Sequence, residues 1–196
     1  MRKISFGNYV VLSGFLAIFC GVLLVVGWTL NIERNSLLGS ILTLFGYVLT
    51  VFATIGICAL HFTIFDFRGK LGAALTIFAS TLFTSWLFLD VARISEVVPF
   101  FDWAEVQSNG PTHKIGVVGG VSFVLGFFLI GFDSIRSGLL PKWPAYVMIL
   151  ASLMPLVYSL VPIGKLLPRI GGLAFIGYGI EMLLFMRRDG KIKTLK

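Results

Sequence analysis

Glu181 is the acidic side chain that lies deepest within a long apolar stretch of this sequence. A carboxylate there must pair with a cation, reach water or take up a proton, because burying its charge alone is too costly. Tyr178 lies one helical turn earlier on the same face, and His61 falls at a similar depth in another apolar stretch. These residues predict a site that holds a proton or a cationic or polar ligand. The alternative is that Glu181 reaches toward the membrane surface and pairs with Arg187 or Arg188.

Polar side chains also recur along one face of the second apolar stretch. They are Thr43, Tyr47, Thr50, Thr54, Cys58 and His61, three or four residues apart, which is the period of one side of an α-helix. Two interpretations fit this face. In the first, it lines a hydrated cavity, with Thr50 and Thr54 as ligand contacts. In the second, which is favoured, it forms hydrogen bonds to the third apolar stretch.

Small residues about four positions apart mark faces on which helices in a membrane approach closely. Such stripes occur on four stretches: Ser13, Ala17 and Gly21; Gly46, Thr50, Thr54 and Cys58; Gly72, Thr76, Ser80 and Thr84; Gly116 and Gly120. Because a short connection joins the second and third stretches, their stripes predict a tight antiparallel hairpin in which the two faces meet.

Two connections in the sequence share a pattern of residues. They read Phe65-Asp66-Phe67-Arg68-Gly69-Lys70 and Phe132-Asp133-Ser134-Ile135-Arg136-Ser137-Gly138. One interpretation is the remnant of a repeated helical hairpin. The other is two independent turns in which Asp caps a helix and Gly allows a tight turn.

The elements that position these residues follow from composition. The 196-residue chain is 57% apolar and 13% charged, against roughly 45–50% and 25% in a soluble domain, with a mean hydropathy of +0.96. A transmembrane helix needs about 20 mainly apolar residues, and six stretches qualify: 9–30, 38–61, 71–89, 115–132, 145–161 and 170–186. We therefore expect one integral membrane domain over residues 1–196, an all-α membrane protein with a six-transmembrane-helix bundle.

The connection over residues 90–114 is the longest between these stretches. Apolar residues from Ile94 to Phe101 follow helical spacing, which predicts a short outer interfacial helix. Arg93 lies three residues from both Asp90 and Glu96, so it is placed to pair with them. A lid that gates access to the bundle or receives a partner is the alternative.

Basic residues set the expected orientation, because short connections rich in Lys and Arg stay in the cytoplasm. With the N-terminus inside, 11 of the 16 Lys and Arg residues fall on the cytoplasmic side. We therefore expect a multi-pass protein of the cell membrane with both termini in the cytoplasm, and a site at Glu181 that faces the cytoplasm. The lipid bilayer is the expected partner, and the net charge of +7, spread over short runs, excludes a nucleic-acid binder.

The residue types favour a function without covalent chemistry. His61 and His113 are the only histidines, too few for a three-histidine zinc site, and no phosphate-binding glycine loop is present. We expect no metal, no cofactor and no catalytic residue. The expected function is a small transporter or ligand-binding membrane protein. The alternatives are an accessory subunit that docks on another membrane protein or on a second copy of itself, and a lipid-modifying membrane enzyme.

The second half of the chain carries one resemblance. Gly131-Phe132-Asp133, the run from Arg136 to Trp143 and the run from Gly171 to Tyr178 are similar to the corresponding parts of uncharacterised prokaryotic six-helix membrane proteins. The resemblance covers roughly the last 70 residues and implies a six-helix membrane fold for the family. It implies no activity and no functional residue.

Overall fold

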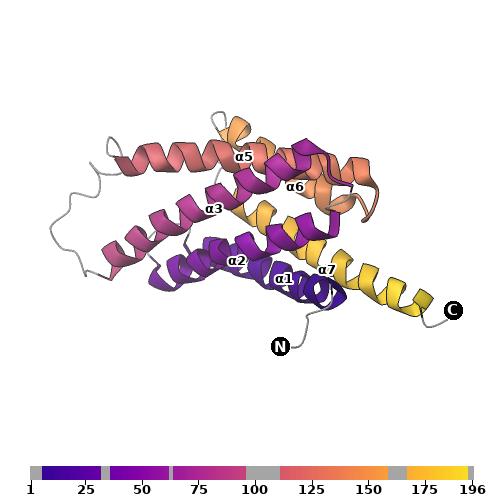
Figure 1. Cartoon of the computed structure of the whole chain (residues 1–196). Coiled ribbons are helices and arrows are strands. Elements are labelled where there is room, and N and C mark those ends of the chain that lie inside the picture. Colours follow the sequence, from indigo (N-terminus) through magenta and orange to yellow (C-terminus); the bar gives the residue numbers. More distant parts are fainter. Residues whose placement is uncertain (1–5, 32–35, 62–63, 96–110, 159–166, 194–196) are drawn as a thin grey trace.

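The structure is a computed structural model that describes residues 6–31, 36–61, 64–95, 111–158 and 167–193. Within these ranges the chain forms six α-helices and no strand. The helices, labelled in Figure 1, are α1 (Phe6–Leu30), α2 (Leu37–His61), α3 (Phe67–Ile94), α5 (Pro111–Ser137), α6 (Trp143–Tyr158) and α7 (Leu167–Lys193). The prediction of an all-α fold is confirmed.

Five of the described helices are long and apolar enough to cross a membrane. They contain the first four and the last of the predicted spans, and most of them continue into the charged connections. The remaining predicted span falls on α6, which has 16 residues. The outer interfacial helix predicted beyond Ile94 falls largely on residues 96–110, outside the described residues.

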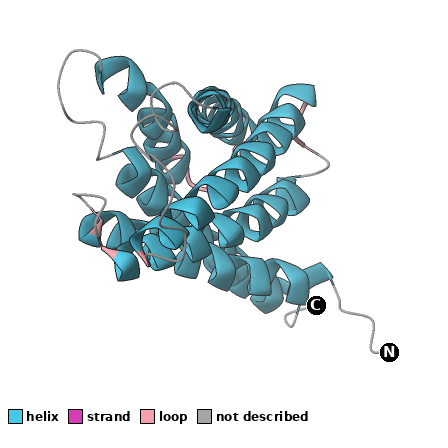
Figure 2. Cartoon of the chain, turned by 90° about the vertical axis from the view of Figure 1, so that its left-hand side faces the viewer, coloured by secondary structure: helices cyan, strands magenta, loops and turns pink. Residues whose placement is uncertain are grey.

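The helices are arranged so that each contacts its neighbours in the chain, and α7 closes the arrangement by packing against α1. The contact between α1 and α7 is the most extensive, followed by those of α1 with α2 and of α3 with α5. Figure 2 looks at the bundle from the end opposite the termini and shows helices on all sides of its interior.

The helices alternate in direction, so each end of the bundle holds the start of some helices and the end of others. α1, α3 and α6 begin, and α2, α5 and α7 end, at the end where both chain termini lie (Figure 1). We call this end the terminal end and the opposite one the distal end. His61 is the last residue of α2, and Glu181, just past the middle of α7, is bonded to Trp143 at the start of α6, so both residues belong to the terminal half.

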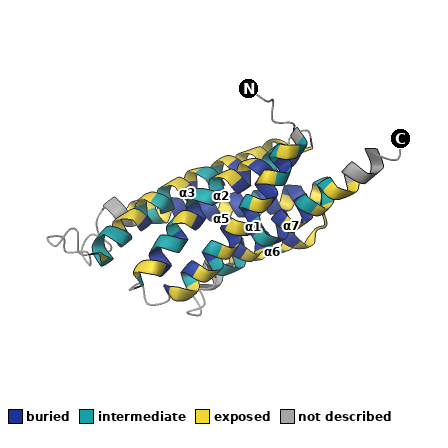
Figure 3. Cartoon of the chain, turned by 90° about the horizontal axis from the view of Figure 1, so that it is seen from below, coloured by how far each residue is buried: buried dark blue, intermediate teal, exposed yellow. Residues whose placement is uncertain are grey.

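Apolar side chains cover the outside of the bundle. Figure 3 shows exposed residues along the outer faces of the helices and buried residues on the inner faces. Phe15, Phe52, Phe88, Val121 and Leu173 are each at least half exposed, although they are large and apolar. An apolar outer surface of this extent is typical of a bundle that is solvated by lipid.

Glycines set the closest helix contacts. On α1 and α7, Gly14 faces Gly179 and Gly21 faces Gly172, and a Cβ on Gly172 would lie 2.8 Å from the Gly21 carbonyl oxygen. Each pair is reciprocal, since a Cβ on either glycine would meet the backbone oxygen of the other. The backbones of α1 and α7 therefore approach directly, as small residues permit in membranes.

The small-residue stripes of α2 and α3 do not face each other, so the prediction that they meet is wrong. Gly46 on α2 packs against Leu24 of α1, and a Cβ there would lie 2.8 Å from the leucine side chain. Gly72 on α3 packs instead against Gly126 of α5. A stripe shows where backbones can approach, but it does not specify which helix fills the place. The α2–α3 contact is made by larger side chains, among them Tyr47 and Phe83.

Aromatic side chains fill the interior between the two ends. Tyr47 of α2 stacks on Phe83 of α3, with ring centroids 5.1 Å apart. Both rings contact Phe123 of α5, which lies 4.1 Å from Phe127, and Phe127 in turn meets Phe175 of α7 at 5.7 Å. These five rings, which we call the aromatic layer, join four helices on the distal side of His61 and Tyr178.

Candidate functional site

The α2–α3 and α5–α6 turns are bonded to each other at the terminal end. Asp133 Oδ2 on α5 accepts hydrogen bonds from the backbone N–H groups of Asp66 and Gly69, at 3.0 and 3.1 Å. Asp133 thus caps the first turn of α3 from another helix. Arg136 pairs with the Asp66 carboxylate at 2.8 Å. A Cβ on Gly69 would collide with Asp133 Oδ2, so only glycine permits this approach.

The two similar turns are therefore not equivalent in the structure. Asp66 lies just before α3 and makes no capping hydrogen bond with its side chain, whereas Asp133 lies inside the last turns of α5. Gly138, with φ of +62°, takes the left-handed conformation that ends a helix, but Gly69 lies within α3. The repeated-hairpin interpretation gains no support from this placement.

His61 is fully buried beside these turns. Its Nδ1 lies 2.9 Å from the Ile57 carbonyl oxygen, and its ring stacks on Phe65, with centroids 4.6 Å apart. Because a carbonyl oxygen only accepts, Nδ1 carries the proton, and Nε2 of the neutral ring is an acceptor. Nε2 is buried without a hydrogen-bond partner among the described residues, and Asp133 is near enough to interact with charge on the ring.

Three buried hydroxyl groups share this half of the interior. The Tyr178 hydroxyl on α7 lies close enough to the Ser134 hydroxyl on α5 to interact with it, but the two groups do not reach the geometry of a full hydrogen bond. Thr54 lies two turns before His61 on the same face of α2, and its Oγ1 also has no partner within the described part of the chain. Each of these three side chains is at most 3% exposed. With His61, these hydroxyls form what we call the interior polar site.

Glu181 is held at the contact of α6 and α7. Its Oε1 accepts a hydrogen bond of 2.9 Å from Trp143 Nε1, and the glutamate is 9% exposed. The indole lies over Gly177, where a Cβ would come within 2.7 Å of the ring. In the described ranges no ion pair reaches Glu181, so neither Arg187 nor Arg188 takes the role that the alternative prediction gave them.

The structure thus places the predicted site residues in two groups. Tyr178, His61 and Thr54 line the interior, whereas Glu181 turns toward α6. Thr50 belongs to neither group, because its Oγ1 contacts Cys20 of α1 at 3.3 Å and donates to the Gly46 carbonyl oxygen at 3.0 Å. No hydrogen bond or ion pair links any two of these five predicted residues in the part of the chain that is described.

The hydroxyls of α2 and α3 bond mainly within their own helices. Thr43 donates to the Gly39 carbonyl oxygen and Ser80 to that of Thr76. The hydrogen bonds between α2 and α3 that the sequence favoured are not seen among the described residues. A hydroxyl that finds a carbonyl four residues back on its own helix needs no partner on another helix.

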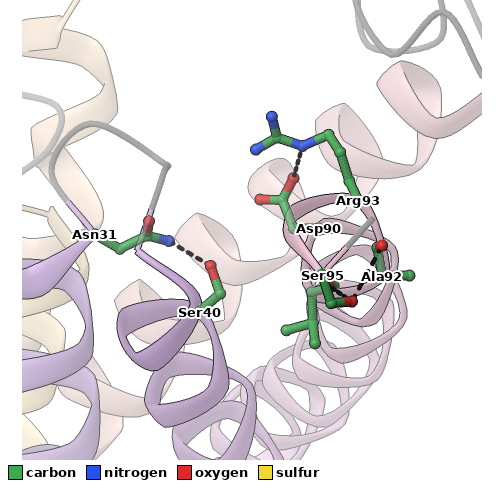
Figure 4. A network of polar contacts seen from close by, with 7 residues as sticks. Asn31, Ser40, Asp90, Ala92, Arg93 and Ser95 are labelled. Carbon is green, nitrogen blue, oxygen red and sulfur yellow. Dashed lines mark hydrogen bonds and ion pairs between the residues drawn. The ribbon is translucent and has the colours of Figure 1, made fainter. Parts of the chain in front are cut away.

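The predicted outer residues lie at the distal end, where Figure 4 shows the polar contacts. Arg93 pairs with the buried Asp90 at 3.5 Å, as the spacing predicts. Glu96 lies outside the described residues. On the neighbouring helices, Asn31 Nδ2 donates to Ser40 Oγ at 2.9 Å. These contacts are separated from the interior polar site by the aromatic layer.

Two residues of this region were missed by sequence reasoning. The sequence assigned Trp143 no role as a partner of Glu181, because their hydrogen bond depends on how α6 is rotated against α7. Ser134 is a small polar residue in an apolar helix, and only its position beside Asp133 gave it a signal. In the described residues, His, Cys, Asp and Glu do not gather in groups of three that suit a metal ion.

Comparison of the chain with models of known protein families, with characterised proteins and with solved structures finds no match in any of the three.

Proposed function

We propose that this chain is a small multi-pass transporter or ligand-binding membrane protein, and that it takes a polar solute at the interior polar site. The observation that carries the proposal is a group of four buried polar atoms in the terminal half of the bundle that complete no hydrogen bond with the described residues: Thr54 Oγ1, His61 Nε2, Ser134 Oγ and Tyr178 OH. All four belong to side chains almost completely buried in the bundle.

The free-energy cost of burying these atoms without hydrogen-bond partners supports a hydrated or ligand-filled site. A buried polar group without a partner costs about 1–3 kcal/mol in proteins, and lipid supplies no alternative partner. The four groups of the interior polar site are therefore costly to bury unless water or a solute bonds to them.

The two halves of the interior suggest that the site is reached from the terminal end. Five aromatic rings fill the interior toward the distal end, and they offer a solute few hydrogen-bonding groups. The polar residues lie on the other side of these rings, near the turns at Asp66 and Asp133. If the termini are cytoplasmic, as the distribution of Lys and Arg predicts, the solute enters from the cytoplasm.

The proposal includes α6 as a sixth membrane span. Its 16 described residues reach about 24 Å at ~1.5 Å per residue, most of the ~30 Å of an average hydrocarbon core. Trp143 begins the helix and is 44% exposed, so its ring is suited to the headgroup region, where tryptophan is frequent.

Thiol labelling tests whether the interior polar site is hydrated. Thr54→Cys is prepared on a Cys58→Ala background, in lipid nanodiscs, and treated with the neutral reagent N-ethylmaleimide. Because maleimides react with hydrated, ionisable thiols, we expect one adduct by intact mass. Native Cys20 is the matched dry control, since it is buried between α1 and α2 with its Sγ 3.4 Å from the Gly46 carbonyl oxygen.

The control variant retains Cys20 but has threonine at position 54, and it should remain unmodified until the protein is denatured. The proposal is overturned if the thiol introduced by Thr54→Cys is as unreactive as Cys20 in the folded protein and both react after denaturation. Ser134→Cys provides the same measurement from α5, in case the α2 variant does not yield homogeneous protein.

A further inference from the structure

We infer that the solute is a small uncharged molecule that both donates and accepts hydrogen bonds, such as a polyol or an amide, and not an ion. This inference rests on the proposed function and specifies its ligand. It follows from the chemistry of the atoms that remain unpartnered at the interior polar site and from the pairing of the charged groups around it.

The unpartnered atoms belong to neutral groups. His61 Nε2 accepts a hydrogen bond, because the proton on the ring is used by Nδ1 toward the Ile57 carbonyl oxygen. The hydroxyls of Thr54, Ser134 and Tyr178 can each donate and accept. A molecule with hydroxyl or amide groups satisfies such a set, because it offers a donor to His61 and groups of both kinds to the hydroxyls.

The carboxylates nearby already have donors. Asp133 accepts two backbone N–H groups of α3, and Glu181 accepts the Trp143 indole on the α6 side of α7. Asp66 pairs with Arg136, and that pair is more than half exposed. Arg68, Lys70, Lys142 and Arg187 lie at the surface of the terminal end.

An ion would therefore find little compensation at the interior polar site. Moving a charge out of water is costly, and the cost is recovered only by an opposite charge or several strong donors or acceptors at close range. A cation finds its nearest carboxylate, Asp133, directed at the start of α3. An anion finds hydroxyl donors, but none of the buried residues that the structure describes is a lysine or arginine. An uncharged molecule bears no such cost.

Protection of the engineered thiol tests the ligand class. Thr54→Cys on the Cys58→Ala background is labelled with N-ethylmaleimide in nanodiscs, in the presence of glycerol, urea, tetramethylammonium or acetate at equal concentration and ionic strength. We expect at least one of the uncharged probes to slow labelling at least threefold, and neither ion to do so. Labelling of free cysteine in the same solutions corrects for direct effects on the reagent.

The Tyr178→Phe variant shows whether protection occurs at the site. Removing this hydroxyl should abolish the protection while labelling without a probe continues. The inference fails if an ion protects the thiol as well as the uncharged probes do, or if none of the four protects it, although labelling itself shows a hydrated interior. If the thiol does not react at all, the proposed function fails, and the inference fails with it.

Discussion

Glu181 is a buried carboxylate whose described hydrogen-bond donor is an indole and not a cation. Such a pair places a polar contact at the α6–α7 interface, where the ring of Trp143 packs over Gly177. The bond orients the beginning of the shortest described helix against α7. We therefore expect the main role of this hydrogen bond to be the positioning of α6.

The Trp143→Phe variant tests this role. It retains an aromatic ring over Gly177 but removes the N–H donor, so we expect a loss of about 1–3 kcal/mol in the free energy of unfolding, because a carboxylate remains buried without its donor. The measurement is denaturant unfolding in mild detergent. In a Glu181→Gln background the same substitution should cost clearly less, because a neutral amide is easier to leave unpaired. If Trp143→Phe lowers the free energy of unfolding equally in both backgrounds, Trp143 and Glu181 are not coupled and the assigned role of their hydrogen bond is wrong.

The sequence predicted part of this arrangement. The depth of Glu181 and its separation from Tyr178 follow from residue spacing alone. Its partner does not, because Trp143 lies 38 residues away, and their contact depends on the rotation of two helices. Likewise, the capping of α3 by Asp133 joins residues 64 and 67 positions apart, a pairing that local patterns do not contain.

At the scale of the helices, glycine pairs decide which faces meet. A Cβ added to Gly21 would meet the backbone oxygen of Gly172, and the reverse also holds. A Cβ added to Gly116 or Gly120 on α5 would have no atom within 4 Å. The same residue type therefore has two roles in one chain. The stripe pattern of the sequence marked Gly21 and Gly120 alike, and only the packed structure distinguishes them.

Alanine substitutions separate these roles. Gly172→Ala forces a methyl group against the Gly21 carbonyl oxygen, and we expect a loss of about 1–3 kcal/mol, as overpacking usually costs. Gly120→Ala is the matched control. It should be neutral or stabilising by up to ~1 kcal/mol, because alanine is the better helix former. The two variants are compared by thermal unfolding in the same detergent. A similar shift of the unfolding temperature for both would refute the assigned contact between Gly172 and Gly21.

At the scale of the whole molecule, composition was enough to predict the class of protein, an all-α membrane protein. Hydropathy is a sum over many residues, so the five long helices are evident before any packing is known. Hydropathy does not predict the length of α6 or which helices lie next to each other. They depend on side-chain shape at specific contacts, such as Leu24 against Gly46, and no sum over the sequence contains them.

The placement of both termini at one end leads to a test of orientation. Lys and Arg are concentrated in the terminal-end connections, so we expect both ends of the chain in the cytoplasm. Fusion of a reporter that is active only in the cytoplasm, at either terminus, should give signal in both cases. A fusion with a reporter active only outside the cytoplasm is the control. Signal from that control at the C-terminus would contradict the expectation.

The closure of α7 on α1 has a consequence for how the protein is made. The ribosome completes α1 long before α7, and until then the surface carrying Gly14 and Gly21 has only lipid beside it. Assembly therefore finishes with the largest helix contact and not with a minor one. We expect a chain cut short before α7 to keep that glycine surface uncovered and to be degraded faster than the full chain.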